Sequence, residues 1–248
     1  MSSAPFSGTI LDVLRRRATT TPNDVYLEVS KDRALTYGEA NVLAQSVIAE
    51  SLKSRLPTSS QSGAPRRVAL LAPNGPLLPL THWALWTLGA IASPLSTTSE
   101  PQVWAAILEK LQATAVVVSN SLLPRLLPVL GDLVQHVSII VLESLLPGLA
   151  PSASMSDIID VCHKVLSAGS ITTSNTVAQV SPTDTAFILF TSSAVDKSTV
   201  KAVELTHEMV LHDAHRMVKH QGLNYGDVPR RHLSWLPMGH AFELLCGL

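Results

Sequence analysis

The 248-residue sequence predicts an α/β fold, in which mainly parallel strands are flanked by helices. Short continuous apolar runs recur along the chain, as buried parallel strands require; Thr114–Val118 and Val137–Leu142 are two of them. Segments with apolar residues at helical spacing separate these runs. Because parallel strands need a crossover connection, the alternation favours a doubly wound sheet over an all-helical or all-β chain.

The first part of the chain predicts a helix, a short hairpin and a second helix. Thr9–Ala18 has helical spacing, and Val25–Val29 alternates as a half-buried strand does. Thr36 and Glu39 form a capping-box pattern, which predicts that a helix begins there. The Ser-, Pro- and Gly-containing stretch Ser54–Arg66 predicts a surface loop.

Strands and helices alternate through the middle of the chain. The predicted strands are Val68–Leu71, Ile91–Pro94, Thr114–Val118 and Val137–Leu142. The predicted helices are one that carries Trp83 and Trp86, then Pro101–Leu111, Leu122–Leu130 and Asp157–Leu166. We interpret the two tryptophans as core residues of an α/β layer.

Composition excludes several classes of function. Hydrophobic residues make up 46% of the chain, charged residues 15%, and the net charge is −1, so no attraction to nucleic acid is indicated. The two cysteines lie far apart, which favours a reducing compartment, and we expect a cytoplasmic protein. The uncharged run Val68–Ser99 contains prolines and leaves too short an apolar segment to span a membrane.

Common cofactor and metal motifs do not occur. The chain has no Gly-x-Gly-x-x-Gly fingerprint, no Walker pattern and no Gly-x-Ser-x-Gly elbow. His212 and His215 share a helical face with His220 nearby, but no carboxylate or cysteine completes a ligand set. We therefore assign no metal ligand and no catalytic residue. A nicotinamide-dependent oxidoreductase would fit the sheet but lacks its fingerprint.

The stretch Asp184–His207 combines a buried strand, a polar loop and a second strand. The predicted strands are Ala186–Phe190 and Val200–Leu205, and Thr206 then caps a helix that reaches about Gln221. Hydroxyls, free backbone N–H groups and a lysine suit this loop to an anion. The candidate phosphate-binding residues are Thr191, Ser192, Ser193, Ser198, Thr199 and Lys201. The alternative is a polar hairpin that binds nothing.

This stretch resembles the phosphate-binding signature of adenylate-forming (AMP-binding) enzymes, which include acyl-CoA synthetases and the adenylation domains of peptide synthetases. The matching residues are Phe190-Thr191-Ser192, Lys201, Val203 and Thr206-His207. The signature's glycines are absent: Ser193, Asp196 and Ala202 stand at or near their positions. Glycine permits positive φ and a close backbone approach to phosphate, so the loop departs from the family where contact matters.

Further segments resemble the same family. Leu35–Ala40 carries a Leu-Thr-Tyr-x-Glu pattern, and Val68–Leu95 carries a Pro-Asn turn followed by Gly-Ala and Pro-Leu pairs. The segment Leu236–Glu243 reads Leu-Pro-x-x-His-x-Phe-Glu and is similar to a landmark of acyl-CoA synthetases. The resemblance implies that His240 lies near the acyl and nucleotide pocket.

The resemblance implies an ATP- and Mg²⁺-dependent reaction in which a carboxylic acid becomes an acyl-adenylate, with CoA or a carrier protein as possible acceptor. It covers the N-terminal portion of such enzymes, with a first subdomain at residues 1–180 and the start of a second at 181–248. We expect these residues to be inactive alone and to expose apolar surface near Leu233–Leu236 and around Phe242 and Leu244–Leu248. The alternative is a non-catalytic acyl- or nucleotide-binding or protein-interaction module.

Overall fold

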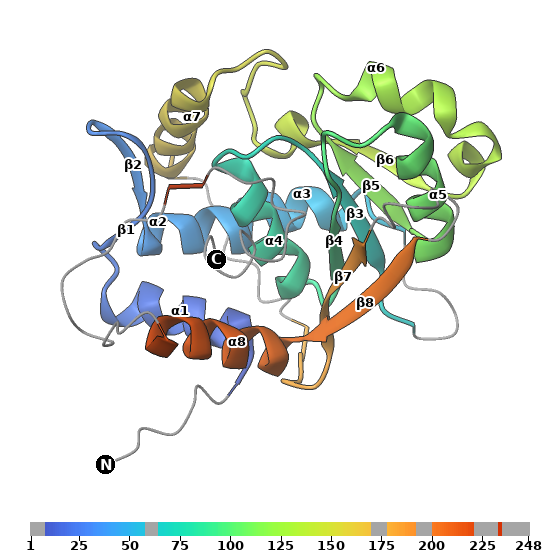
Figure 1. Ribbon diagram of the computed structural model, residues 1–248. Coiled ribbons are helices and arrows are strands. Elements are labelled where there is room, and N and C mark those ends of the chain that lie inside the picture. Colours follow the sequence, from blue (N-terminus) through green and yellow to red (C-terminus); the bar gives the residue numbers. More distant parts are fainter. Residues whose placement is uncertain (1–7, 58–63, 170–177, 192–199, 221–232, 235–248) are drawn as a thin grey trace.

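The computed structural model describes residues 8–57, 64–169, 178–191, 200–220 and 233–234 (Figure 1). A two-stranded antiparallel hairpin, β1 (Val25–Ser30) with β2 (Arg33–Thr36), lies apart from a six-stranded sheet. The strands of the large sheet run in the order β6-β5-β3-β4-β7-β8. Their bounds are β3 Arg67–Leu71, β4 Ile91–Pro94, β5 Ala115–Val118, β6 Ser138–Val141, β7 Thr185–Thr191 and β8 Lys201–Thr206.

All neighbouring pairs of the large sheet are parallel except β7 with β8. The predicted α/β fold with mainly parallel strands is therefore confirmed. The boundary expected at residue 180 stays a prediction; strands on both sides of it, β4 and β7, pair within one sheet.

Helices cover both faces of this sheet. The α-helices are α1 Ile10–Thr20, α2 Tyr37–Val42, α3 Ala49–Lys53, α4 Leu77–Thr87, α5 Pro101–Leu111, α6 Leu123–Leu126, α7 Met155–Ser167 and α8 His207–His220. A π-helical segment, Leu43–Ile48, joins α2 to α3, and 3-10 turns lie at Leu127–Val129, Gly131–Gln135 and Leu142–Leu145. Helices α1 and α8 lie side by side (Figure 1).

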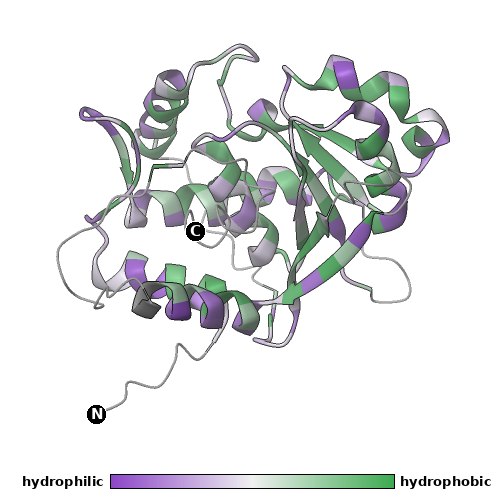
Figure 2. Cartoon of the chain, in the orientation of Figure 1, coloured by the Kyte–Doolittle hydropathy of each residue, from purple (hydrophilic) through white to green (hydrophobic). Residues whose placement is uncertain are grey.

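Alternate residues of the central strands enter two separate cores. Val68 and Leu70 face the core formed with α1, α4, α7 and α8, whereas Ala69 and Leu71 face the core formed with α5 and α6. Every residue of β5 is buried, which explains its unbroken apolar sequence. Trp83 and Trp86 have no exposed surface, so the prediction that both are core residues is confirmed. Figure 2 shows the central strands in green, the apolar colour.

The predicted capping box at Thr36 is confirmed. The Glu39 side chain accepts a hydrogen bond of 2.8 Å from the Thr36 N–H, and the Thr36 hydroxyl accepts one of 3.2 Å from the Glu39 N–H. The same reciprocal pair occurs at the start of α1 between Thr9 and Asp12. Each box satisfies N–H groups that a helix start would otherwise leave unpaired.

Two predicted elements differ from the structure. The helix expected at Leu122–Leu130 is a short α6 followed by a 3-10 turn, because Pro128 lacks the N–H that an α-helix would need there. The strand expected at Leu233–Leu236 lies mostly outside the described residues; Leu233 and Ser234 are described and are not in a strand. Leu233 is 79% exposed, but most of the expected apolar surface lies outside the described residues, so that expectation stays a prediction.

Candidate phosphate-binding site

The predicted phosphate loop joins the two strands of an antiparallel hairpin. Strand β7 ends at Thr191, strand β8 begins at Lys201, and these two residues are register partners. Direct partners in an antiparallel ladder project their side chains to the same face, so a hydroxyl and an ammonium group stand together at the loop end of the hairpin. Both residues are exposed. The other candidates, Ser192, Ser193, Ser198 and Thr199, lie outside the described residues.

The inner half of β7 is fixed firmly to the sheet. Phe187 pairs with Ala92 of β4, and the Ser93 hydroxyl donates a buried hydrogen bond of 2.7 Å to the Ile188 carbonyl. The Trp86 indole N–H donates a buried bond of 3.1 Å to the Ala186 carbonyl. These contacts hold residues 186–188, whereas Thr191 projects beyond them.

The loop end of the hairpin, where β8 begins, lies next to helix α5 (Figure 1). Val200, which directly precedes β8, is 6% exposed and packs into the core beneath α5. The Lys110 ammonium group, in the last turn of α5, donates a hydrogen bond to the Val200 carbonyl. The segment that leads into Lys201 is thus held by a residue 90 positions earlier in the chain.

His207, part of the family-like Thr-His pair, is a core residue and not an exposed ligand. The Thr206 hydroxyl accepts a bond of 3.2 Å from the Met209 N–H, which confirms its predicted role as the cap of α8. The His207 ring is 1% exposed and lies edge-on to Trp86 at 5.7 Å. Burial lowers its pKa to about 4, although Asp184 and Asp12 act in the opposite direction.

A second buried histidine escaped the sequence analysis. His82 of α4 contacts Trp86 and Phe187, with ring centroids 5.9 and 5.5 Å away, and its Nδ1 lies 2.8 Å from the Leu78 carbonyl. Burial lowers its pKa to about 4. Its position in an uncharged run between apolar residues was the available signal for a neutral core histidine. His82 and His207 therefore share Trp86 as a neighbour.

Ser234 lies just before the family-like segment Leu236–Glu243 and contacts the turn between β3 and α4. The Asn74 side-chain amide donates a hydrogen bond of 2.8 Å to the Ser234 hydroxyl. His240, the residue predicted near the acyl pocket, lies outside the described residues, so its placement stays a prediction.

Metal ligands were not assigned from the sequence. Within the described ranges, no group of three or more His, Cys, Asp or Glu side chains is placed to hold a metal ion. His212 instead has its Nδ1 3.8 Å from the carboxylate of Asp213. In the same described ranges, no helix is long and apolar enough to cross a membrane.

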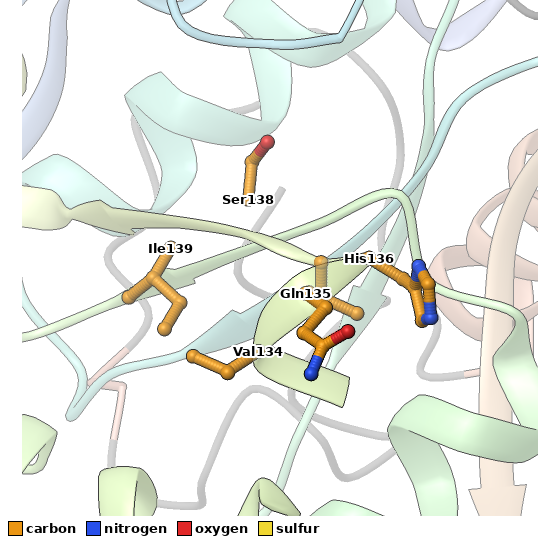
Figure 3. A pocket seen from close by; sticks show the side chains of 6 residues that line it. Val134, Gln135, His136, Ser138 and Ile139 are labelled. Atoms are coloured by element: carbon orange, nitrogen blue, oxygen red, sulfur yellow. The ribbon is translucent and has the colours of Figure 1, made fainter. Parts of the chain in front are cut away.

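A shallow hollow of about 320 Å³ lies elsewhere on the molecule (Figure 3). A single segment, residues 134–139, lines it, and this segment leads into β6, at the opposite edge of the sheet from β8. Its side chains include Gln135 and His136 and no Asp, Glu, Lys or Arg. The hollow is therefore separate from the hairpin that carries the candidate residues.

The mainly parallel sheet with its edge hairpin is compatible with the class of adenylate-forming enzymes, and comparison with known proteins shows that class. A family profile described as AMP-binding enzyme matches residues 14–248, so the chain belongs to this family. A curated relative, the mitochondrial malonate–CoA ligase of Xenopus laevis, is 30% identical over 93 residues. That match covers 38% of this chain and 16% of the relative.

Solved structures of low sequence identity have the same fold. The structure of VinN with 3-methylaspartate superposes with a TM-score of 0.71 at 18% identity, over 99% of this chain and 60% of VinN. The N-terminal subdomain of Klebsiella oxytoca NpsA gives a TM-score of 0.56 at 18% identity, over 84% of this chain and 44% of that one. The chain thus spans between two fifths and three fifths of the structures it matches, and a smaller share of the curated relative.

Proposed function

We propose that this chain forms the N-terminal part of a carboxylate-activating, ATP-dependent ligase, and that the loop end of the β7–β8 hairpin receives the outer phosphates of ATP. The observation that carries the proposal is the pairing of exposed Thr191 with exposed Lys201 at the two ends of the loop. A hydroxyl donor next to an ammonium group provides both hydrogen bonding and charge neutralisation for a phosphate.

The proposed chemistry follows from these groups. A carboxylate attacks the α-phosphorus of ATP, the bond to the bridging oxygen breaks, and acyl-adenylate and pyrophosphate result. The Thr191 hydroxyl would donate to a phosphate oxygen, and Lys201 would offset the charge that leaves with pyrophosphate. Thr191 and Lys201 suit a polyphosphate by their chemistry. Among the described residues no group of three or more His, Cys, Asp or Glu side chains is placed to hold Mg²⁺, so we assign the cation to none of them.

We further propose that the 248 residues alone form no acyl-adenylate. The stretch 192–199 contains no glycine, and Ser193 at a position that requires positive φ would cost on the order of 1 kcal/mol. Additional side chains would also hinder the close approach of backbone N–H groups to phosphate. Weak anion binding would remain, because Thr191 and Lys201 are retained.

The test is carboxylate-dependent exchange of labelled pyrophosphate into ATP, with a panel of fatty, aryl, amino and dicarboxylic acids. Malonate belongs in the panel because the Xenopus laevis relative is a malonate–CoA ligase. We expect no exchange above a Lys201→Ala control. Exchange clearly above that control would contradict the proposed inactivity and would identify the acid. The acceptor, CoA or a carrier protein, and the cytoplasmic location remain predictions from sequence.

A second candidate function is a binding module that has kept the fold without the chemistry. The glycine-free loop favours it, since the absence of glycine hinders the close approach of the backbone to phosphate that the reaction would use. Carboxylate-dependent pyrophosphate exchange by a longer product would favour the ligase over the binding module. In such an active product, restoring glycine at Ser193 and Asp196 then tests whether the loop occupies the phosphate site. A higher rate would indicate an impaired ligase; an unchanged rate would mean that the loop is not aligned with the family's phosphate loop.

A further inference from the structure

The hairpin that carries the candidate phosphate site has few contacts with the rest of the sheet near its loop end. Strand β7 makes a single register contact with β4, at Phe187 and Ala92. Residues 201–204 of β8 are exposed. The position of Lys201 therefore depends on the ladder with β7 and on whatever holds the residue before it.

That residue, Val200, is held in two ways. Its side chain packs into the core beneath α5, and its carbonyl accepts a hydrogen bond from the Lys110 ammonium group. A bond from a charged donor is stronger than one between neutral groups. The carbonyl of Val200 belongs to the peptide unit whose N–H is that of Lys201, so this bond also fixes the orientation of the backbone at Lys201.

Lys110 belongs to a well-packed part of the molecule, the last turn of α5. Its neighbours Leu108 and Leu111 are buried in the same core that contains Val200. The Arg67 guanidinium, at the start of β3, donates to the Leu111 carbonyl at 3.3 Å. The last turn of α5 is thus tied to the central strand, and Lys110 extends from this fixed point to the hairpin.

We propose that Lys110 is a positioning residue for the phosphate site: it holds the peptide unit between Val200 and Lys201 and so keeps Lys201 opposite Thr191. The inference rests on the proposed function of the hairpin. It adds a residue outside the family-like stretch that supports the β8 side of the loop, beyond the ladder with β7.

The experiment compares Lys110→Met, which keeps the apolar stem, with Lys110→Arg, which restores a charged donor. Lys31→Met, in the exposed turn between β1 and β2, is the matched control for the loss of one positive charge. Amide exchange over residues 200–203 is measured by NMR in the 248-residue protein, and binding of inorganic tripolyphosphate is measured by calorimetry.

We expect Lys110→Met to speed exchange at residues 200–203 and to weaken tripolyphosphate binding, each about tenfold, the typical effect of losing a hydrogen bond to a charged group. Lys110→Arg should recover most of both effects, and Lys31→Met should change neither. Equal exchange in Lys110→Met and the parent protein would overturn the inference whether or not the anion binds. Faster exchange with unchanged affinity would also overturn it, since Lys110 would then serve stability alone.

A Lys201→Ala variant separates this inference from the proposed function. If it leaves the affinity for tripolyphosphate unchanged, the proposed phosphate site is wrong, and the exchange data alone then decide whether Lys110 holds β8. If Lys201→Ala weakens binding but Lys110→Met does not, the site stands and the positioning role fails.

Discussion

The central strands β3 and β5 and the hairpin of β7 and β8 belong to one sheet but differ in their surroundings. Residues of β5 are all buried and are covered by helices on both faces, whereas the first four residues of β8 are exposed. In Figure 2 the central strands are mainly apolar, whereas β8 combines polar and apolar residues. The comparison indicates that stability resides in the centre, and that the edge is free to carry polar groups for binding.

The joint between the two regions is the set of buried contacts that Trp86 makes with β7, and substitutions there should lower the free energy of unfolding most. Trp86 is fully buried, contacts Phe187, His82 and His207, and bonds to the Ala186 carbonyl. We expect Trp86→Ala to lower the free energy of unfolding by about 3–5 kcal/mol, as truncation of a buried aromatic side chain does. Denaturant unfolding checks this, with Trp86→Phe as a milder control; a loss below about 1 kcal/mol would show that the joint is not part of the stable core.

Acid should weaken the same joint. Because burial lowers the pKa of His82 and His207 to about 4, the unfolded chain, with histidine pKa near 6.5, takes up protons first as pH falls. The contribution of these two histidines to stability is therefore fully present well above pH 6.5 and declines as pH falls through 6.5 towards 4, by about 2 kcal/mol for each histidine at pH 5 relative to pH 7.

Unfolding measured at pH 7 and pH 5 tests this window. His82→Met removes one titrating ring, so it should reduce the difference between the two pH values by about half. Ring proton shifts that titrate near pH 6.5 for both buried histidines would contradict the account.

The Ser93 hydroxyl should have a smaller effect on the joint. It donates a buried hydrogen bond to the Ile188 carbonyl, and Ser93→Ala should lower the free energy of unfolding by about 1 kcal/mol. Ser152→Ala, in an exposed turn, is the control and should have no effect. A neutral Ser93→Ala would mean that the other contacts of β7, among them the Trp86 bond to the Ala186 carbonyl and the pairing of Phe187 with Ala92, hold it without this hydrogen bond.

On the hairpin itself, an apolar truncation should be almost without consequence. Val203 lies in β8 and is 42% exposed, so Val203→Ala should change the free energy of unfolding by less than about 0.5 kcal/mol. A loss as large as that of a core valine would indicate that this face of β8 is covered in solution. Thermal unfolding at several protein concentrations would detect such self-association.

The sequence predicted the centre of the fold well, because residues buried on both faces must be apolar throughout. Val68–Leu71 and Ile91–Pro94 are strands within one residue of the predicted bounds, and the Thr36 capping box is present. The π-helical segment Leu43–Ile48 was not predicted, since its apolar spacing resembles that of an α-helix over so few residues. Pro128 did carry a usable signal for the end of α6.

The candidate site was less predictable, because its support comes from distant parts of the chain. Thr191 and Lys201 were found from the family-like pattern, and the structure brings them together as ladder partners. Lys110 and Asn74 were missed, since their contacts with Val200 and Ser234 depend on how α5 and the β3–α4 turn pack. A local sequence pattern contains no information on such tertiary contacts.

The most direct test of the division between a stable centre and a binding edge is Lys201→Ala, measured in two ways on the same sample. Lys201 is exposed at the loop end of the hairpin, so its replacement should change the free energy of unfolding by less than about 0.5 kcal/mol. The affinity of the variant protein for tripolyphosphate should be about tenfold lower than that of the parent, because a charged hydrogen-bond donor is removed. Unchanged affinity, or a loss of stability as large as that of Ser93→Ala, would contradict the account.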